Sequence, residues 1–162
     1  MSVSVIAGDI FKIKTEAIVN LVNCVGVADK GLNIYFKKNY PAMDNDYIKT
    51  CGSGDLSSGT IMFWSTNKTS PNIVIYFPVK KYWKEIENLS YIKNGLDTLS
   101  ALSKNLNLES LAMPFIGDAF NPNSIKIYEM VENEFKDSRV EILMVIPDNT
   151  PEARRSEFTV VR

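Results

Sequence analysis

Histidine is absent from this chain of 162 residues. Its absence removes the commonest general base, the usual partner of serine and cysteine nucleophiles, and the commonest transition-metal ligand. Any catalysis must therefore depend on lysine, aspartate, glutamate, asparagine or tyrosine. Cysteine is scarce too, and Cys24 and Cys51 do not have metal-binding spacing. We expect reduced thiols, with no disulfide framework, no metal site and no resident cofactor.

The chain also lacks a strong net charge and a long hydrophobic run. Eighteen Lys and Arg residues oppose nineteen Asp and Glu residues. This balance gives no overall field that would attract nucleic acid or a membrane surface, so an anionic ligand must be held locally. Residues 1–7 have no basic segment of the kind found in signal peptides. We expect a cytoplasmic monomer without membrane association or strong general affinity for nucleic acid.

Short apolar runs alternate with segments of helical periodicity. Six runs predict strands, at residues 2–8, 16–23, 60–66, 72–78, 110–116 and 140–147. Several are continuously apolar, which is typical of strands covered on both faces. This alternation predicts an α/β sandwich with a largely parallel sheet, and such folds bind ligands at the carboxyl ends of their strands.

Three segments have helical periodicity. The long helix has an apolar stripe formed by Leu89, Ile92, Leu96, Leu99, Leu102 and Leu106, with Asn88 or Ser90 as its cap. A second helix follows Pro122, with Asn123 or Ser124 as cap and Ile125, Tyr128, Val131 and Phe135 facing inward. A shorter one covers residues 31–39. We interpret residues 1–147 as one domain and residues 148–162 as an extension that ends in an added edge strand.

The stretch from residue 20 to residue 31 combines polar side chains and glycines between a strand and a helix. Asn20 and Asn23 end the strand, Gly26 lies in the loop, and Lys30 and Gly31 open the helix. Asparagine amides can bind sugar hydroxyls, and the free N–H groups of a helix start suit an anion. Alternatively, the asparagines satisfy turn backbone and the glycines serve tight turns. Both interpretations remain open from these residues alone.

Five motifs in the same order resemble macrodomains. They are "GDI" at 8–10, "IVNLVNCVGVADKGLNIYFKKNYP" at 18–41, "CGSGDLSSGTIMFW" at 51–64, "FPVKKYW" at 77–83 and "LAMPFIG" at 111–117. The resemblance is strongest to the branch of the DNA ADP-ribosyl glycohydrolase antitoxins and terminal ADP-ribose protein glycohydrolases. It implies a three-layer α/β/α sandwich with a mixed, largely parallel six-stranded sheet. It also implies a cleft for ADP-ribose, and removal or reading of ADP-ribose attached to protein or nucleic acid.

The resemblance assigns roles to residues of the first motifs. Asp9, followed by Ile10, matches the residue that accepts a hydrogen bond from the adenine amino group, although it could instead begin a helical turn. Asn23 would lie beside the distal ribose. The first loop, which would pass along the distal ribose and phosphates, contains Gly26, Lys30 and Gly31. For Lys30, a solvated charge at a helix end is the alternative.

Lys80 in "FPVKKYW" coincides with the lysine that this branch uses for catalysis near the anomeric carbon. A lysine amine can attack or activate such a carbon. We therefore expect Lys80 to be the reactive group and Asn23 to orient the distal ribose. The alternative is that Lys80 and Lys81 are solvated surface charges after a strand.

The second loop, within "AMPFIGDAFNPNS" at 112–124, departs from the family pattern. Pro114 and Gly117 are kept, but Ala119 replaces a usual glycine, and Asn121 stands where protein-directed members have a catalytic Asp. Asparagine cannot act as a base, although it can bind ribose. The loop can still bind phosphate because any residue except proline presents an N–H group.

Two other residues of this loop would also border the ligand. We expect Asp118 to turn outward or to cap the next turn, because a carboxylate facing inward would repel pyrophosphate. Phe120 could stack on the ligand or pack into the core.

Three hypotheses about function follow: a hydrolase that uses Lys80, an ADP-ribose-binding module with little turnover, or a divergent fold that binds another nucleotide or a protein partner.

Overall fold

The computed structural model describes residues 2–28, 31–116, 123–147 and the backbone of 160–161. The elements, in chain order, are β1 (Val3–Ala7), the short 3-10 helix η1 (Ile10–Lys12), β2 (Ala17–Val22), α1 (Gly31–Asn39), α2 (Pro41–Gly52), β3 (Met62–Ser65), β4 (Ile73–Pro78), α3 (Leu89–Asn105), β5 (Ser110–Pro114), α4 (Ser124–Phe135), β6 (Glu141–Ile146) and β7 (Val160–Val161). Within these residues, no helix is both long and apolar enough to cross a lipid bilayer.

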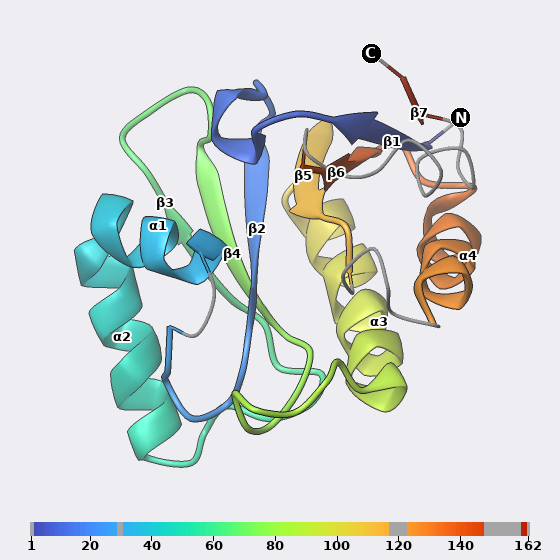
Figure 1. The fold of residues 1–162 in the computed structure, drawn as a ribbon. Coiled ribbons are helices and arrows are strands. Elements are labelled where there is room, and N and C mark those ends of the chain that lie inside the picture. The colour runs from blue at the N-terminus through green and yellow to red at the C-terminus, as the bar shows by residue number, and fades with distance from the viewer. Residues whose placement is uncertain (1, 29–30, 117–122, 148–159, 162) are drawn as a thin grey trace.

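The strands form one sheet in the order β3-β4-β2-β5-β6-β1-β7. Neighbouring strands pair in parallel, except that β3 is antiparallel to β4. Helices α1 and α2 cover one face of the sheet, and α3 and α4 cover the other (Figure 1). The predicted three-layer α/β/α sandwich with a mixed, largely parallel sheet is therefore confirmed. β7 adds a two-residue strand beside β1 at one edge.

All six residues of β4 are buried, as expected for a central strand that is covered by helices on both faces. β1, β2, β4, β5 and β6 run in the same direction, so their carboxyl ends meet at one edge of the sheet. We call this the carboxyl edge. Asp9 follows β1 there, Asn23 follows β2, Lys80 follows β4 and Ile116 follows β5.

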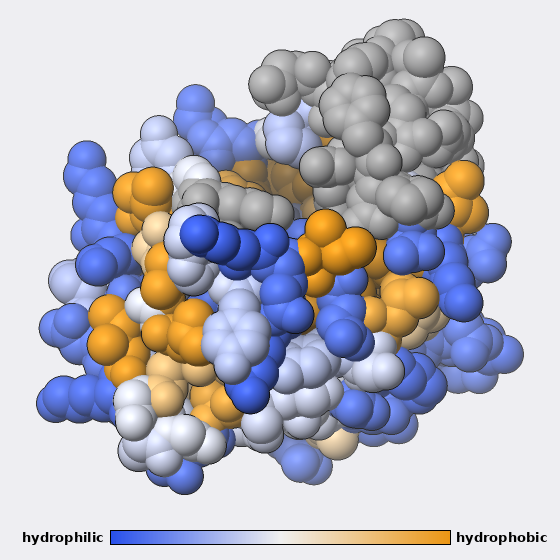
Figure 2. All heavy atoms as spheres, turned by 60° about the horizontal axis from the view of Figure 1, so that its bottom comes forward, coloured by the Kyte–Doolittle hydropathy of each residue, from blue (hydrophilic) through white to orange (hydrophobic). Residues whose placement is uncertain are grey.

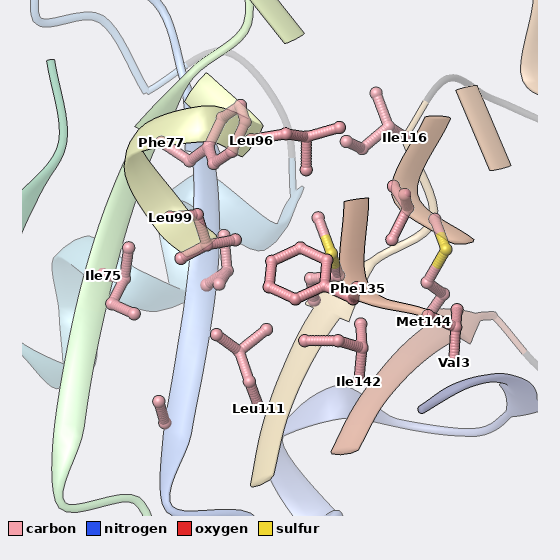
Figure 3. Packing of buried hydrophobic residues seen from close by; sticks show 14 of the residues in the cluster. Val3, Ile75, Phe77, Leu96, Leu99, Leu111, Ile116, Phe135, Ile142 and Met144 are labelled. Atoms are coloured by element: carbon pink, nitrogen blue, oxygen red, sulfur yellow. The ribbon is translucent and has the colours of Figure 1, made fainter. Parts of the chain in front are cut away.

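Helix α3 has the predicted cap and the predicted apolar stripe. The Asn88 side chain accepts hydrogen bonds from the backbone N–H groups at the start of the helix. Leu96 and Leu99 point into the core formed with β4 and α4 (Figure 3). At Gly95 the helix comes so near to the sheet that a Cβ atom would lie 2.4 Å from Cζ of Phe77. Glycine is therefore required here for close packing.

One expectation about the helices was wrong, and one helix was missed. Ile125 is 47% exposed and does not face inward, because the buried stripe of α4 consists of Ile127, Val131 and Phe135. Helix α2 was not predicted. Its buried residues are Asp44 and Tyr47, and a stripe with a charged residue does not look apolar in the sequence.

Candidate functional site at the carboxyl edge

The loops that follow β2 and β4 lie side by side at the carboxyl edge. Their pairing continues beyond the strands, since Val79 N donates to Val22 O and Cys24 N donates to Lys81 O, both at 2.9 Å. This pairing brings the two neighbours of Lys80 in the chain, Val79 and Lys81, beside Val22 and Cys24, the two neighbours of Asn23. Both loops run along the lower edge of Figure 1, and Figure 2 turns this edge toward the viewer, where hydrophilic and hydrophobic side chains are interspersed.

The Asn23 side chain is fully buried and hydrogen-bonded to its own loop. Oδ1 accepts from Val25 N at 3.0 Å and Val27 N at 3.3 Å, and Nδ2 donates to Val27 O at 2.7 Å. The Tyr47 hydroxyl, from α2, lies 2.7 Å from Asn23 O and 3.1 Å from Oδ1. These contacts match the alternative in which Asn23 satisfies turn backbone. Its amide thus shapes the loop that follows β2.

Glycine at position 26 allows this loop to turn against α2. Gly26 has φ of +79°, a left-handed conformation that residues with a side chain rarely adopt. A Cβ atom there would meet Ile48 Cα at 3.5 Å and Cys51 Cβ at 3.6 Å, which are ordinary contacts. The backbone conformation, rather than space, therefore requires glycine. Gly31 is the first residue of α1, and Lys30 lies outside the described residues.

A buried polar network lies beneath the loop, between the sheet and helices α1 and α2. Asn33 Nδ2, from α1, donates to Asn20 Oδ1 at 2.7 Å and to Leu21 O at 2.8 Å. Tyr76, which pairs with Asn20 across β2 and β4, donates its hydroxyl to Asp44 Oδ1 at 2.7 Å. Burial raises the pKa of Tyr76, and the bond to Asp44 adds to the shift. Asn20 is thus engaged inside the fold.

Sequence reasoning missed three members of this network: Asn33, Asp44 and Tyr76. The available signal was weak. Asn33 lies among apolar residues, Asp44 lies beside the polar Asn45 and Asp46, and the burial expected for Tyr76 in its apolar strand did not identify a hydrogen-bond partner. Only the pairing of β2 with β4 and the docking of α1 and α2 bring these side chains together.

The two cysteines are free thiols beside this network. The pKa of Cys24 is raised to about 11, chiefly by burial and in smaller part by the nearby Cys51, while the positive charge of Lys81 opposes the shift. Burial also raises the pKa of Cys51. Because the thiolate is the nucleophile, neither cysteine is activated for attack at neutral pH.

Lys80 is only 5% exposed, an unusual environment for a lysine. Its Nζ donates a hydrogen bond to Trp83 O at 3.0 Å. Lys81, by contrast, is exposed. The alternative in which both lysines are solvated surface charges is therefore wrong for Lys80. Because α/β sheets bind ligands at the carboxyl ends of their strands, a buried amine in this position is a candidate for a reactive group.

Asp9 remains exposed at the carboxyl end of β1. Its Oδ1 accepts a hydrogen bond from Phe11 N at 3.0 Å and caps η1, so Asp9 does begin a helical turn. The Ile10 side chain is buried in the core on the side of α1 and α2. A ligand could therefore contact Asp9 through its carboxylate, but Ile10 only through its backbone.

The second loop leaves β5 at the carboxyl edge. Pro114 is buried and pairs with Val145 of β6, and Phe115 N donates to Val145 O at 3.0 Å. The predicted ligand-contacting residues Gly117, Asp118, Ala119, Phe120 and Asn121 lie outside the described residues. Among the residues that are described, no cluster of three or more Cys, Asp or Glu side chains could hold a metal ion.

Comparison with known proteins gives consistent matches. Residues 19–121 match the model of the family described as Macro domain. A DNA ADP-ribosyl glycohydrolase of Mycobacterium tuberculosis is 40% identical over 112 residues, which are 68% of this chain and 32% of that protein. One of Thermus aquaticus is 32% identical over 113 residues, 69% of this chain and 31% of that protein. The chain thus spans about a third of the length of these curated relatives.

Solved structures match over nearly the whole described fold. The macrodomain of Thermus aquaticus DarG has a TM-score of 0.81 at 27% identity, covering 90% of this chain and 98% of the other. The macrodomain of Mycobacterium tuberculosis DarG has a TM-score of 0.78 at 34% identity, covering 90% of this chain and 97% of the other.

Proposed function

This chain belongs to the Macro domain family, and from that premise we propose that it binds ADP-ribose at the carboxyl edge and hydrolyses ADP-ribosyl linkages with Lys80 as the reactive group. The observation that carries the proposal is the burial of the Lys80 side chain at the carboxyl end of β4, beside the loop that contains Asn23. A lysine is rarely buried without a function or a strong compensating interaction.

The proposed chemistry uses the side-chain amine of Lys80 as the nucleophile. Nζ donates its electron pair to the anomeric carbon of the distal ribose, and the bond from that carbon to the modified group breaks. The modified group leaves with the bonding pair and takes up the proton that Nζ loses on forming its bond to carbon. Water then attacks the same carbon, the carbon–nitrogen bond breaks with its electron pair returning to Nζ, and Nζ takes up a proton from the water, which releases ADP-ribose and restores Lys80. Neither step requires histidine, an aspartate at position 121 or a metal ion.

We propose DNA as the polymer that carries the ADP-ribose. The names of the relatives from Mycobacterium tuberculosis and Thermus aquaticus support this choice, since both are DNA ADP-ribosyl glycohydrolases. Asn121, where protein-directed family members have an Asp, also favours a substrate other than protein.

The remaining ligand contacts follow the order of the loops along the carboxyl edge. In the proposal, Asp9 and the backbone of Ile10 bind the adenine end. The first loop, with Gly26, Lys30 and Gly31, borders the distal ribose and phosphates. Residues of the second loop, from Pro114 to Asn121, are assigned to the phosphates as well. The burial of Asn23 supports an indirect role, in which its amide holds the first loop in shape beside the distal ribose.

The first test combines calorimetry with ADP-ribose and a cleavage assay on ADP-ribosylated single-stranded DNA and Glu-linked ADP-ribosylated protein. Lys80→Met removes the amine but keeps most of the buried stem. Lys104→Ala, an exposed lysine at the end of α3, is the matched control. We expect cleavage of the DNA substrate to be lost only in Lys80→Met. Binding without turnover in the wild type would assign the chain as a reader of ADP-ribose, and no binding at millimolar ligand would reject the proposal.

The second test addresses Asp9. Asp9→Asn keeps an oxygen that can accept from Phe11 N, so the cap of η1 is preserved, while Asp9→Ala removes the cap as well. Loss of a charged acceptor for the adenine amino group should weaken ADP-ribose binding by about 1–3 kcal/mol in both variants. Thermal stability should fall only in Asp9→Ala. Wild-type affinity in both variants would exclude the adenine contact.

The third test separates the roles of Asn23 and Lys80. Asn23→Ala should raise KM or the Kd for ADP-ribose because the first loop loses its hydrogen bonds, with a smaller effect on kcat than Lys80→Met. A loss confined to kcat would instead indicate direct contact between Asn23 and the reacting ribose.

A further inference from the structure

Four consecutive residues after Lys80 form an exposed surface of two aromatic rings and two lysines. The aromatic platform, as we call it, consists of Lys81, Tyr82, Trp83 and Lys84. Tyr82 is 51% exposed and Trp83 is 43% exposed. Large aromatic side chains contribute strongly to burial, so two adjacent exposed rings on a loop indicate a binding surface.

Each ring of the platform is accompanied by a cation. Lys81 Nζ lies 5.2 Å from the centroid of the Tyr82 ring, and Lys84 Nζ lies 5.1 Å from the centroid of the Trp83 ring. Rings on which bases can stack, beside lysines that can reach phosphates, are the two elements with which proteins bind single-stranded nucleic acid. The bases of a duplex are stacked on each other and cannot stack on such a ring.

The backbone connects the platform to the candidate site. Lys80 Nζ donates to Trp83 O at 3.0 Å, and Lys81 O accepts from Cys24 N in the first loop at 2.9 Å. The platform therefore begins one residue after the proposed reactive lysine and shares backbone contacts with the loop proposed to border the distal ribose. A polymer attached to the ADP-ribose must leave the site near this position.

The charge of the segment is modest. Residues 80–87 contain three lysines and two glutamates. The carboxylate of Glu85 accepts a hydrogen bond from Tyr82 N at 2.7 Å and so closes the turn of its own loop. Such a surface orients a bound strand by stacking and adds little general affinity for nucleic acid. This agrees with the nearly neutral net charge of the chain.

We propose that Tyr82 and Trp83 stack on nucleobases next to the ADP-ribosylated nucleotide of a single-stranded nucleic acid, while Lys81 and Lys84 contact the adjoining phosphates. This inference rests on the proposed function, and it adds a specificity-determining surface outside the ADP-ribose cleft. This surface would favour a modified nucleotide within a single strand over the same modified nucleotide without flanking nucleotides.

The test compares wild type with Tyr82→Ala and Trp83→Ala on two substrates: an ADP-ribosylated single-stranded oligonucleotide, and the same ADP-ribosylated nucleoside without flanking nucleotides. Phe63→Ala, which removes a 45% exposed ring on β3, is the matched control. KM for the oligonucleotide should rise about 5- to 100-fold in each platform variant, the range expected when one base loses a stacking partner. KM for the nucleoside should not change.

An unchanged KM for the oligonucleotide would overturn the proposal, and so would an equal loss on both substrates. A similar loss on an ADP-ribosylated peptide would assign the surface to protein instead. If the wild type shows no turnover, the same comparison is made with equilibrium Kd values. The proposal for the platform can therefore be tested even if the protein does not hydrolyse the substrate. If free ADP-ribose fails to bind as well, the proposed function fails, and the platform is then judged by whether an unmodified single strand quenches Trp83 fluorescence.

Discussion

The two faces of the sheet are packed with different chemistry. On the side of α3 and α4 the core consists of aliphatic side chains with Phe77 and Phe135 (Figure 3). On the side of α1 and α2 the core contains tyrosine rings whose hydroxyl groups bind Asp44 and Asn23. Alternate residues of the same strands supply both faces, as Phe77 and Tyr76 do in β4.

This difference separates stability from positioning. Apolar packing stabilises the sheet, but it is not directional and can be rearranged. It therefore does not by itself hold a loop in one defined shape. Hydrogen bonds are directional, and those of Tyr47 and Asn23 fix the path of the first loop beside Lys80. We therefore expect substitutions on the apolar face to lower stability with little effect on ligand affinity, and substitutions on the polar face to affect both.

Phe135→Ala should have the largest effect on stability. Phe135 is fully buried in α4, and truncation of a buried phenylalanine leaves a cavity that costs about 3–5 kcal/mol. Ile125→Ala, at an exposed position of the same helix, should change the unfolding free energy by less than about 0.5 kcal/mol. Urea denaturation measures both. Similar losses in the two variants would contradict the burial pattern of α4, and weakened ADP-ribose binding by folded Phe135→Ala would contradict the division between the faces.

Tyr76→Phe should lower the unfolding free energy by less than Phe135→Ala does, but it should also weaken ADP-ribose binding at the candidate site. It leaves the buried Asp44 carboxylate without the hydroxyl donor at 2.7 Å, a loss worth about 1.5–3 kcal/mol for a hydrogen bond to a charged group. Tyr35→Phe is the control, because Tyr35 is 56% exposed in α1. Denaturation and ADP-ribose calorimetry should both show a loss in Tyr76→Phe alone. Full affinity in a destabilised variant would mean that the network supports the fold but not the loop.

Gly95→Ala tests how closely α3 approaches the sheet. Alanine normally stabilises a helix relative to glycine by about 1 kcal/mol. Here the new Cβ atom would lie 2.4 Å from Phe77, so the ring or the helix must move. Overpacking of this kind costs about 1–3 kcal/mol, so after the helical gain we expect a net loss of up to about 2 kcal/mol. A gain in melting temperature would show that Phe77 can rotate away without cost.

Much of the fold was predictable from the sequence because the periodicities of its elements are simple. The continuous apolar run of β4 and the leucine stripe of α3 identify the sheet and one helical layer directly. Helix α2 was not predictable in this way, because its inward residues, Asp44 and Tyr47, find polar partners that only the folded chain supplies. Position along the chain can indicate Lys80, but its burial and its bond to Trp83 depend on how the loop after β4 folds back.

The polar face should also make the protein sensitive to alkaline pH. A folded-state pKa above the unfolded value means that the unfolded chain releases its proton first, so the stabilisation is complete below the unfolded pKa and is lost as pH rises through the folded one.

For Cys24 this window of pH runs from about 9 to about 11. Burial also raises the pKa values of Tyr47 and Tyr76 above 10, so these groups extend the loss to higher pH. Each group contributes a slope of at most about 1.4 kcal/mol per pH unit. Urea denaturation at a series of pH values should show constant stability from pH 7 to about 8.5 and a decline above it. Cys24→Ala should make this decline shallower but should not abolish it, because the raised pKa of Cys51 still contributes. An identical profile in Cys24→Ala would mean that this thiol is not held in its protonated form by the fold. A decline that is shallower in both Cys24→Ala and Tyr76→Phe would attribute the alkaline sensitivity to the face that carries α1 and α2.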